Sequence, residues 1–391
     1  MAEFDIGIMG ATGFTGRQLA AELSRRAPSG ARILLGGRNL ERLERVAAPL
    51  DLPVCVVDSL NPGQVEDFVS QCRVVVSTVG PFARYGDPLV DACVKQGVHY
   101  LDITGEVPWA RQVIDRHHAR AAEQGTLLLP FSGFDSVPSD LGAWFMVQQL
   151  AAQGQQTRQV LSAFSIKGGF NGGTLASALN MAESFPARAL AHPFWLDPEP
   201  PTDRETLRAH SDPSRPTEHP QLGALAPFFM GSVNTRVVRR SAALAAQAGR
   251  PYGPEFAYQE YMRMSSPAQA WAATAAMGLG VGLLRSKVGR KLAARLGPAP
   301  GEGPSEAEMD GGFVKVRYAA QDQDGRWHKA TLQAAGDPGN RVTVRILAQA
   351  TLAVAEGEGL PGGVLTPAFA LGQGLLDRLE ATGEWSLNLD N

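Results

Sequence analysis

The sequence predicts an α/β fold: a parallel sheet, a second α+β domain, and a C-terminal helix that returns to the first domain. Residues 1–140 alternate short β-prone runs with stretches of helical periodicity, which is typical of a parallel sheet with crossover helices. The later residues form β-rich segments separated by long irregular stretches. The chain has 391 residues, more than one hydrophobic core usually serves. We therefore predict domains at residues 1–135, 136–350 and 351–391.

The composition excludes several classes of protein. With 44% hydrophobic residues, and with 36 basic against 39 acidic residues, the chain is neither disordered nor a polybasic binder of nucleic acid. Its three cysteines, Cys55, Cys72 and Cys93, cannot form a disulfide framework, and no spacing of Cys or His predicts a metal site. The N-terminus carries Glu3 where a signal peptide would carry cations, so we expect a cytoplasmic location.

The first element is a strand, Phe4–Met9, followed by glycines at positions 10, 13 and 16 and by helical periodicity over Arg17–Ala27. A backbone that approaches a pyrophosphate needs residues without a Cβ, and the helix that follows offers free N–H groups. This order is typical of a Rossmann-type dinucleotide site, although three glycines alone also suit a plain turn. The cofactor-binding residues predicted in this loop are Gly10, Thr12, Gly13, Phe14 and Thr15.

The second strand, Arg32–Leu35, ends at Gly36-Gly37-Arg38-Asn39. A carboxylate at this position would bind the ribose hydroxyls of NAD, whereas an arginine attracts a 2′-phosphate. Arg38 therefore favours NADP(H), the alternative being a solvated surface residue. The third strand, Val54–Val57, ends at Asp58, which we expect beside the adenine edge.

Three further strands complete the predicted sheet. The fourth, Val74–Thr78, leads into a turn at the edge where open parallel sheets bind ligands, and the cofactor-binding residues predicted there are Thr78, Val79, Gly80 and Pro81. The other strands are predicted at His99–Ile103 and Thr126–Pro130, and the helices at Asn61–Ser70, Pro88–Gln96 and Trp109–Gln124. Six strands alternating with helices make a complete dinucleotide-binding sheet.

Five ordered motifs in this half form a recognisable set: Gly10-Ala11-Thr12-Gly13-Phe14-Thr15-Gly16, Gly36-Gly37-Arg38-Asn39, Ser77-Thr78-Val79-Gly80-Pro81-Phe82, His99-Tyr100-Leu101-Asp102-Ile103-Thr104-Gly105-Glu106 and Ser132-Gly133-Phe134-Asp135-Ser136-Val137-Pro138-Ser139-Asp140-Leu141-Gly142. Together they resemble the saccharopine dehydrogenase-like oxidoreductases, and within them most closely the branch of the trans-acting enoyl reductases. The resemblance is dense over residues 5–145 and thinner afterwards. It implies an NADP(H) cofactor whose nicotinamide is enclosed by residues 104–106 and 134–138.

Three residues are candidates for catalysis, each with a structural alternative. Glu106 would orient substrate or pass a proton, or else hold its own loop. Asp135 belongs to the loop implied to close over the nicotinamide, although acidic residues there also suit helix capping, for which Ser139 or Asp140 would serve. Tyr85 would stack near the cofactor or donate to a substrate oxygen, or else anchor its loop. No tyrosine is followed at the fourth position by lysine, so the catalytic pair of the short-chain dehydrogenases is absent.

In the second half, a strand at Val160–Ile166 precedes a glycine cluster at 168–173 and a helix at Leu175–Glu183. Asn171 and Thr174 are the predicted substrate residues, as donors to an acyl chain or carbonyl; a plain strand-to-helix turn with an N-cap explains them equally well. Residues 197–222 are expected to form a solvated loop. Further strands are predicted at Gly312–Tyr318 and Trp327–Ala335, and helices at Arg341–Ala355 and Ala368–Thr382.

An apolar stretch, Trp271–Leu284, runs into a series of cations, and no acid lies between Glu260 and Glu302. The stretch is too short for a membrane span of about twenty residues, but an apolar helix joined to a basic one can lie on an anionic bilayer. Peripheral membrane contact through residues 271–295 is therefore one interpretation. A buried helix beside a solvated basic face is the other, and the sequence narrowly favours it.

These observations predict an NADPH-dependent oxidoreductase that reduces the enoyl C=C bond of a lipid or polyketide acyl chain, with a small-molecule or carrier-bound acyl substrate. One alternative is a saccharopine-type amino-acid dehydrogenase acting on an imine. That enzyme needs cations for several substrate carboxylates, and the second half shows no interior arginine cluster outside residues 285–295. A non-catalytic NADP-binding, lipid-associated protein is the other alternative, and a homodimer is left open.

Overall fold

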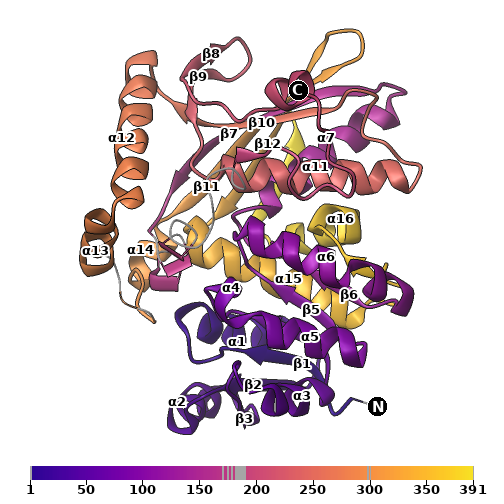
Figure 1. The fold of residues 1–391 in the computed structure, drawn as a ribbon, viewed down its shortest axis with the longest axis vertical. Helices are drawn as coiled ribbons and strands as arrows, with labels where there is room; N and C mark the ends of the chain where they lie inside the picture. The colour runs from indigo at the N-terminus through magenta and orange to yellow at the C-terminus, as the bar shows by residue number, and fades with distance from the viewer. Residues whose placement is uncertain are drawn as a thin grey trace.

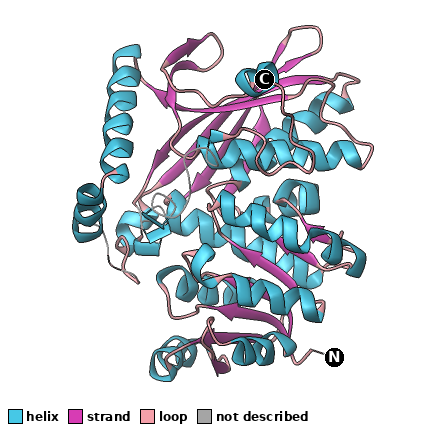
Figure 2. Cartoon of the chain, in the orientation of Figure 1, coloured by secondary structure: helices cyan, strands magenta, loops and turns pink. Residues whose placement is uncertain are grey.

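Two seven-stranded sheets, with helices between and around them, make up the computed structural model (Figure 1, Figure 2). The structure describes residues 2–390 except 170, 174–175, 178, 181–190, 297–298 and 300. Six of the seven strands of the first sheet come from the N-terminal half, and the second sheet lies at the opposite end of the molecule (Figure 1). The predicted α/β fold class, with its Rossmann-type parallel sheet and second α+β domain, is confirmed.

The first sheet is parallel throughout, with strand order β13-β6-β5-β4-β1-β2-β3. All six strands predicted in residues 1–135 are present, and a seventh comes from the far end of the chain. The elements of this half are β1 (Phe4–Met9), α1 (Phe14–Arg26), β2 (Ile33–Gly37), α2 (Leu40–Ala47), a short 3-10 turn (Ala48–Leu50), β3 (Val54–Val56), α3 (Pro62–Ser70), β4 (Cys72–Ser77), α4 (Phe82–Tyr85), α5 (Asp87–Gln96), β5 (His99–Asp102), α6 (Val107–Gln124) and β6 (Leu127–Leu129).

The second sheet is mixed, with strand order β14-β12-β11-β7-β10-β9-β8; β10 pairs with β7 in parallel, and the other pairs are antiparallel. Its elements and those that follow are α7 (Val137–Ala152), β7 (Thr157–Lys167), α10 (Arg204–Ala209), β8 (Thr217–His219), β9 (Gly223–Pro227), α11 (Gly231–Gln247), β10 (Ala257–Met264), α12 (Pro267–Arg285), α13 (Lys287–Leu296), α14 (Glu306–Asp310), β11 (Phe313–Asp322), β12 (Trp327–Ala335), a π-turn (Pro338–Val342), α15 (Thr343–Glu356), β13 (Gly363–Val364), α16 (Pro367–Glu380) and β14 (Trp385–Leu389). The expected loop at 197–222 therefore contains a helix, α10, and an edge strand, β8.

Helix α7 joins the two domains and packs against the inner face of the second sheet. The contact is close because residue 142 is a glycine: a Cβ there would lie 2.2 Å from Cζ of Tyr318. The Tyr318 hydroxyl donates to the carbonyl of Pro138 at 2.8 Å, so the same tyrosine also fixes the first turn of α7. This contact holds the loop before α7, which carries Asp135, in a fixed position relative to the second sheet.

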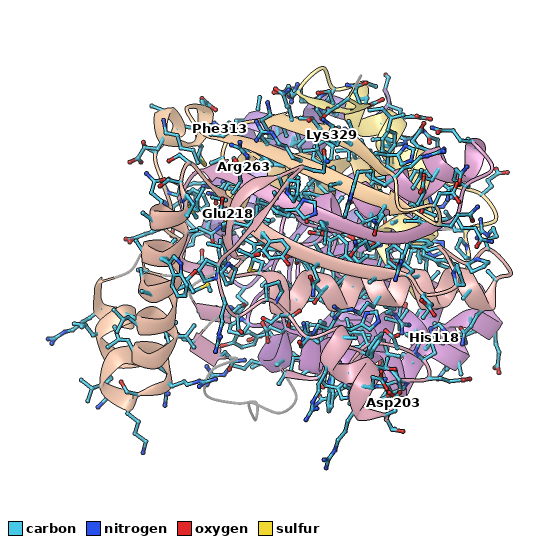
Figure 3. The ribbon with its side chains drawn as sticks, turned by 90° about the horizontal axis from the view of Figure 1, so that it is seen from above. His118, Asp203, Glu218, Arg263, Phe313 and Lys329 are labelled. Atoms are coloured by element: carbon cyan, nitrogen blue, oxygen red, sulfur yellow. The ribbon has the colours of Figure 1, made fainter. Side chains whose placement is uncertain are left out.

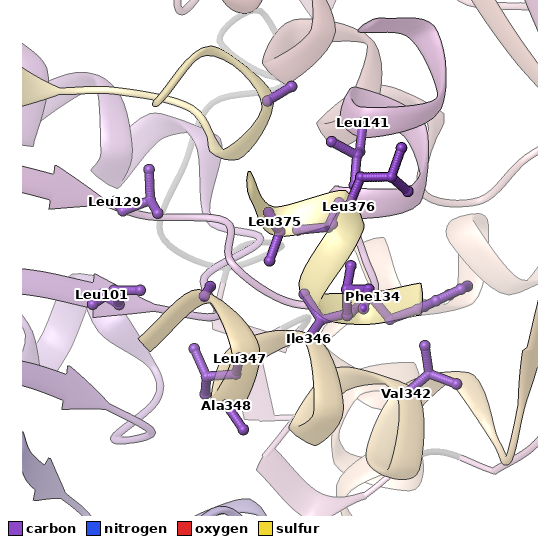
Figure 4. Packing of buried hydrophobic residues seen from close by; sticks show 14 of the residues in the cluster. Leu101, Leu129, Phe134, Leu141, Val342, Ile346, Leu347, Ala348, Leu375 and Leu376 are labelled. Atoms are coloured by element: carbon purple, nitrogen blue, oxygen red, sulfur yellow. The ribbon is translucent and has the colours of Figure 1, made fainter. Parts of the chain in front are cut away.

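The chain returns to the first domain through α15, which packs on α1 and on strands β1, β4 and β5. Figure 4 shows the resulting core, where Ile346 and Leu347 of α15 meet Leu101 of β5 and Leu376 of α16. The seventh strand, β13, then extends the first sheet beside β6. The final strand, β14, pairs with β12 in the second sheet, so the last residues do not stay with the first domain as expected.

Helices α12 and α13 lie at one side of the second sheet, where α12 contacts the edge strands β8 and β9 and their neighbour β10 (Figure 1). In α12, Ala270 is the one described residue that is fully buried, and Trp271 and Leu279 are 62% and 77% exposed. The prediction that this apolar stretch is a buried helix is therefore wrong: it contacts the edge of the second sheet along one narrow stripe only. Among the described residues, none of the helices has the length and apolar character needed to cross a bilayer.

Candidate active site

In the loop between β1 and α1, glycines stand at positions where a side chain would not fit. Gly10 has a φ of +88°, and a Cβ there would lie 2.6 Å from Cγ2 of Val79. The loop is closed by a hydrogen bond of 3.0 Å from the Gly13 N–H to the Gly10 carbonyl. Gly13 is the N-cap of α1 and provides no side-chain cap, so the first N–H groups of the helix remain available to an anion. These features fit the pyrophosphate of a dinucleotide.

Residues 301–305 lie across the start of α1. Gly303 is so close to Phe14 that a Cβ would meet its ring at 2.5 Å, and Arg17 donates to the carbonyl of Gly301 at 3.4 Å. On the other side, the Gly172 N–H donates to the carbonyl of Glu302 at 3.1 Å. The segment thus joins the glycine loop to the glycine cluster of the second domain, beside a hollow of about 460 Å³ lined by Phe14, Arg17, Gln18, residues 301–306 and Met309.

A larger hollow of about 830 Å³ lies further along α1, away from the carboxyl ends of the strands. Its charged side chains pair with one another: Arg341 with Glu306 and Asp310, and Arg345 with Glu384. Paired cations of this kind do not attract a further anion strongly. The smaller hollow lies at the start of α1, where Phe14 and Arg17 follow the glycine loop.

The two residues predicted to contact the adenosine half lie on neighbouring strands. Arg38 follows β2, is exposed, and makes no hydrogen bond or ion pair within the described part of the chain. Asn39 caps α2 by accepting from the Arg42 N–H at 2.9 Å, and so fixes the turn that presents Arg38. One carboxylate oxygen of Asp58 accepts a hydrogen bond from the Leu60 N–H, at 3.0 Å. Arg38 is therefore available to a 2′-phosphate, and Asp58 retains its second oxygen.

The turn after β4 lies directly against the glycine loop. Thr78 Oγ1 is 3.3 Å from both the Met9 and the Gly10 carbonyl oxygens, and the side chain of Val79 fills the space opposite Gly10. Gly80 faces Ser177 of the second domain, where a Cβ would lie 3.2 Å from Ser177 Oγ. Thr78, Val79, Gly80 and Pro81 are all partly exposed, so a ligand can reach them.

Glu106 is fully buried and holds the loops around it. Its carboxylate accepts hydrogen bonds from the N–H groups of Phe82 and Ala83, at 2.7 and 3.0 Å, and from Ser177 Oγ at 3.0 Å. It also lies 3.5 Å from Nδ2 of Asn180. Both oxygens are thus engaged by the start of α4 and by the second domain. Of the two roles considered for Glu106, this geometry supports positioning rather than proton transfer.

Tyr85 and Asp135 lie beyond the carboxyl ends of β4 and β6. Tyr85 is partly exposed at the end of α4, beside the exposed Arg84, whose guanidinium is 5.9 Å from the ring centre. Asp135 is half-buried and makes no hydrogen bond within the described part of the chain, and burial raises its pKa to about 6. Just before it, Phe131 is held at a φ of +64°, a strained backbone that often marks a functional loop.

The predicted caps of α7 are wrong. Its N-cap is Ser136, with no side-chain cap, and Asp140 instead accepts from the Ala368 N–H at 2.8 Å, at the start of α16. Ser139 donates to Glu260 at 2.7 Å. Asp135 does not cap α7 either, because the helix has no side-chain cap. A structural role for Asp135 as a cap is therefore excluded, and the catalytic role remains.

Of the two predicted substrate residues, the structure describes Asn171 but not Thr174. Asn171 is buried, and its amide donates to Oδ1 of Asn340 at 2.8 Å; Asn340 in turn donates to Asp337 at 2.5 Å. This contact ties the glycine cluster to the π-turn before α15 and is structural. Thr174, and much of the helix predicted at Leu175–Glu183, lie outside the described residues.

Comparisons with known proteins identify the family of the chain. Residues 6–129 match the family model of the saccharopine dehydrogenase NADP-binding domain. A trans-acting enoyl reductase of Mycobacterium tuberculosis is 36% identical over 97% of this chain and 96% of its own length. A second protein of that species, which carries this name provisionally, is 38% identical over the same shares.

The chain belongs to the saccharopine dehydrogenase-like oxidoreductases, in the branch of the trans-acting enoyl reductases. It is accordingly an NADP-dependent oxidoreductase. Two solved structures share the fold: saccharopine dehydrogenase of Saccharomyces cerevisiae, with a TM-score of 0.58 and 13% identity, covering 99% of each chain, and homospermidine synthase of Legionella pneumophila in complex with NAD, with a TM-score of 0.56 and 12% identity, covering 98% of this chain and 91% of that one.

A buried acid in the second domain, Glu260 of β10, is a feature that the sequence did not reveal. Its carboxyl group is fully buried and accepts from Ser139 Oγ at 2.7 Å, Tyr258 OH at 3.0 Å and Asn234 Nδ2 at 2.9 Å. Asn234 Oδ1 accepts from Ser136 Oγ at 3.2 Å, next to Asp135. Glu260 therefore fixes the first turn of α7 and, through it, the loop that carries Asp135.

The statement that the second half has no interior arginine cluster is wrong. Helix α11 buries Arg236, Arg239 and Arg240, with exposed fractions of 1%, 3% and 1%. Arg239 donates to the carbonyls of Pro193, His210 and Tyr258, and Arg240 to those of Leu196 and Val364. Arg236 pairs with Asp212 and donates to the carbonyl of His192. The cluster organises irregular backbone around α11, since each arginine bonds to main-chain carbonyls.

Proposed function

We propose that the protein reduces the α,β double bond of an enoyl thioester on a lipid or polyketide acyl chain, with NADPH as the hydride donor. The names of its relatives support this substrate class, and the word trans-acting in those names favours an acyl chain carried on a separate protein. The observation that carries the proposal is Asp135, an acid with a raised pKa and no hydrogen-bond partner within the described residues, at the edge where the nicotinamide is expected.

The residues of the chain would divide the reaction as follows. NADPH supplies a hydride for the β-carbon when it is bound. The N–H groups of Thr104, Glu106, Ser132 and Phe134 are engaged within the protein. The N–H groups of Gly105 and Gly133 would therefore hold the thioester oxygen while negative charge develops on it. Asp135, in its protonated form, would add the proton at the α-carbon, so that one hydride and one proton complete the reduction. Tyr85 would hold the acyl carbonyl or stack beside the nicotinamide.

An imine substrate of the saccharopine type is less well supported. Such a substrate carries several carboxylates, each of which needs a cation. The three buried arginines of α11 donate to main-chain carbonyls instead. Although the fold matches that of a saccharopine dehydrogenase, a likeness at 13% identity bears on the fold alone.

The test is NADPH oxidation, followed by nicotinamide absorbance, with enoyl thioesters of increasing chain length on coenzyme A and on an acyl carrier protein. Saccharopine with NADP⁺ serves as the competing substrate. We expect turnover of the enoyl thioesters, and a loss of about a hundredfold or more in kcat for Asp135→Asn. Tight NADPH binding with no turnover of any thioester would favour the non-catalytic alternative, and turnover of saccharopine alone would favour the amino-acid dehydrogenase.

Two further expectations stay predictions. One is a homodimer. The other is peripheral membrane contact through residues 271–295, which the exposure of large apolar side chains in that stretch supports.

A further inference from the structure

The outward face of α12 lacks the charges that an exposed helix normally carries. Helical periodicity places Ala270, Ala273, Met277 and Leu284 on one narrow stripe, and these are buried or half-buried against the body of the protein. The opposite face is water-exposed from residue 268 to residue 283, and it contains no ionisable side chain. Exposed helix faces of water-soluble proteins are usually polar or charged. This face therefore calls for a covering partner.

Large apolar side chains are spread along the exposed surface of both helices. Trp271 lies near the start of α12, Leu279 and Leu283 lie further along it, and Val288 of α13 is 78% exposed. Figure 1 shows the two helices as a column beside the sheets, and Figure 3, seen from above, shows them standing off to one side of the second sheet. Most of this apolar surface consequently meets no other part of the described chain.

Cations follow directly upon the apolar surface. Arg285, Lys287, Lys291 and Arg295 are exposed, and none of them forms an ion pair with the described residues. Arg290 turns back and donates to the carbonyls of Leu284 and Arg285, which fixes the corner between the two helices. No acid occurs from residue 261 to residue 301. The surface is thus apolar along α12, and along α13 its charged side chains are all positive.

We propose that α12 and α13 dock on an anionic lipid bilayer, with the apolar face of α12 inserted among the acyl chains and the cations of α13 at the phosphate level. Apolar side chains beside unpaired cations match the two layers of a bilayer surface in a way that a neutral protein groove does not. The chain after α13 runs to residues 301–305, which lie on Phe14 and Arg17 beside the cofactor loop. Docking would therefore place the start of α1, next to the glycine loop, near the membrane surface, whatever acyl substrate the enzyme takes.

The test is flotation of the full-length protein with vesicles of phosphatidylcholine alone and with vesicles that also contain phosphatidylglycerol. We expect flotation with the anionic vesicles, and a weakening by added salt. The double variant Leu279→Glu with Leu283→Glu removes apolar insertion, and Lys287→Glu with Lys291→Glu reverses two charges. Each pair should lower the affinity for vesicles about tenfold or more. The lysine pair should do so because one basic residue near an anionic surface contributes about fivefold in binding. The leucine pair should do so because it replaces inserted apolar side chains by carboxylates.

Matched controls are Leu389→Glu on β14 and Lys329→Glu on β12, two exposed positions remote from α12. Both should float as the unaltered protein does, and all variants should keep its melting temperature and its NADPH affinity. The proposal is overturned if the unaltered protein does not float, if it floats equally with neutral vesicles, or if the α12 and α13 variants float like the controls. It is also overturned if Leu279→Glu converts a dimer to a monomer while no vesicles bind, because a second copy of the chain would then cover α12. The readout is binding, so failure of the proposed reaction would leave it unaffected.

Discussion

The buried acid Glu260 makes a sharp prediction about the pH dependence of stability. Burial raises the pKa of Glu260 from 4.5 to about 7, and hydrogen bonds from Ser139, Tyr258 and Asn234 offset this only in part. The folded protein therefore binds this proton more tightly than the unfolded chain does. The contribution of Glu260 to stability is fully present below pH 4.5 and is lost as the pH rises towards about 7.

The magnitude follows from the size of the shift. A change from 4.5 to about 7 corresponds to a loss of about 3 kcal/mol of unfolding free energy once the pH exceeds the folded value. The carboxyl group is fully buried, so no discount for solvent screening applies. Glu260→Gln keeps the shape of the side chain and removes the ionisation, and the hydroxyls of Ser139 and Tyr258 can turn to suit the new amide. We expect the variant to gain about 2–3 kcal/mol on the unaltered protein between about pH 5 and pH 8.

The measurement is urea-induced unfolding across that pH range, for the unaltered protein, Glu260→Gln and the control Glu218→Gln. Glu218 is an exposed residue of β8 in the same sheet, so its replacement should leave the pH dependence unchanged (Figure 3). The difference between Glu260→Gln and the unaltered protein isolates Glu260 from the other buried acids. A difference that stays constant from pH 5 to pH 8 would show that Glu260 does not change ionisation in this range, and would refute the reasoning.

Three predictions concern the cofactor and the reaction. Arg38→Asp should weaken NADPH binding by about ten- to a hundredfold, through loss of charge-assisted hydrogen bonds, and should weaken NADH binding much less. The control variant Arg42→Asp should change NADPH binding much less than Arg38→Asp does. Equal losses of affinity for both nucleotides would remove the 2′-phosphate argument. Gly10→Ala should lower the melting temperature and NADPH affinity, because its Cβ would lie 2.6 Å from Cγ2 of Val79 at a φ of +88°; calorimetry and nucleotide titration measure both, and an unchanged variant would contradict this steric argument. If protonated Asp135 is the proton donor, kcat should fall as the pH rises through about 6. The variant Asp135→Asn should have a low kcat that does not change with pH in this range. An unaltered pH profile of kcat in the variant would assign the proton to another group.

The first domain could be predicted closely because its signals are local. Strands buried on both faces are continuous apolar runs, and each glycine or arginine of a strand-ending motif has its consequence within a few residues along the chain. The strand from Phe4 to Met9 and the loop at Gly10 therefore lie where the sequence places them.

Burial in the second half depends on residues far apart in sequence, which a local pattern does not contain. Helix α11 contains three arginines and resembles a solvated helix, yet carbonyls of residues 192–212 and of β10 and β13 surround its guanidinium groups. Helix α12 is apolar and resembles a core helix, yet few elements reach it. Glu260 is flanked by Tyr258 and Met262 in a strand that the sequence did not predict, and only the position of α7 beneath it shows that it is buried.

Residue type alone would assign the acids around this site wrongly. Asp102 is buried at the end of β5 and accepts from Tyr100 OH at 2.8 Å and the Thr104 N–H at 2.9 Å, so it holds the loop after β5. Glu106 holds the loop after β4, and Glu260 holds the loop after β6 by way of α7. Each of the three loops that end at the expected nicotinamide position is thus fixed by a buried acid whose oxygens are already engaged. Among these acids Asp135 is the exception, because its carboxyl group bonds to no described residue, and a group that must give up a proton to substrate has to keep such freedom.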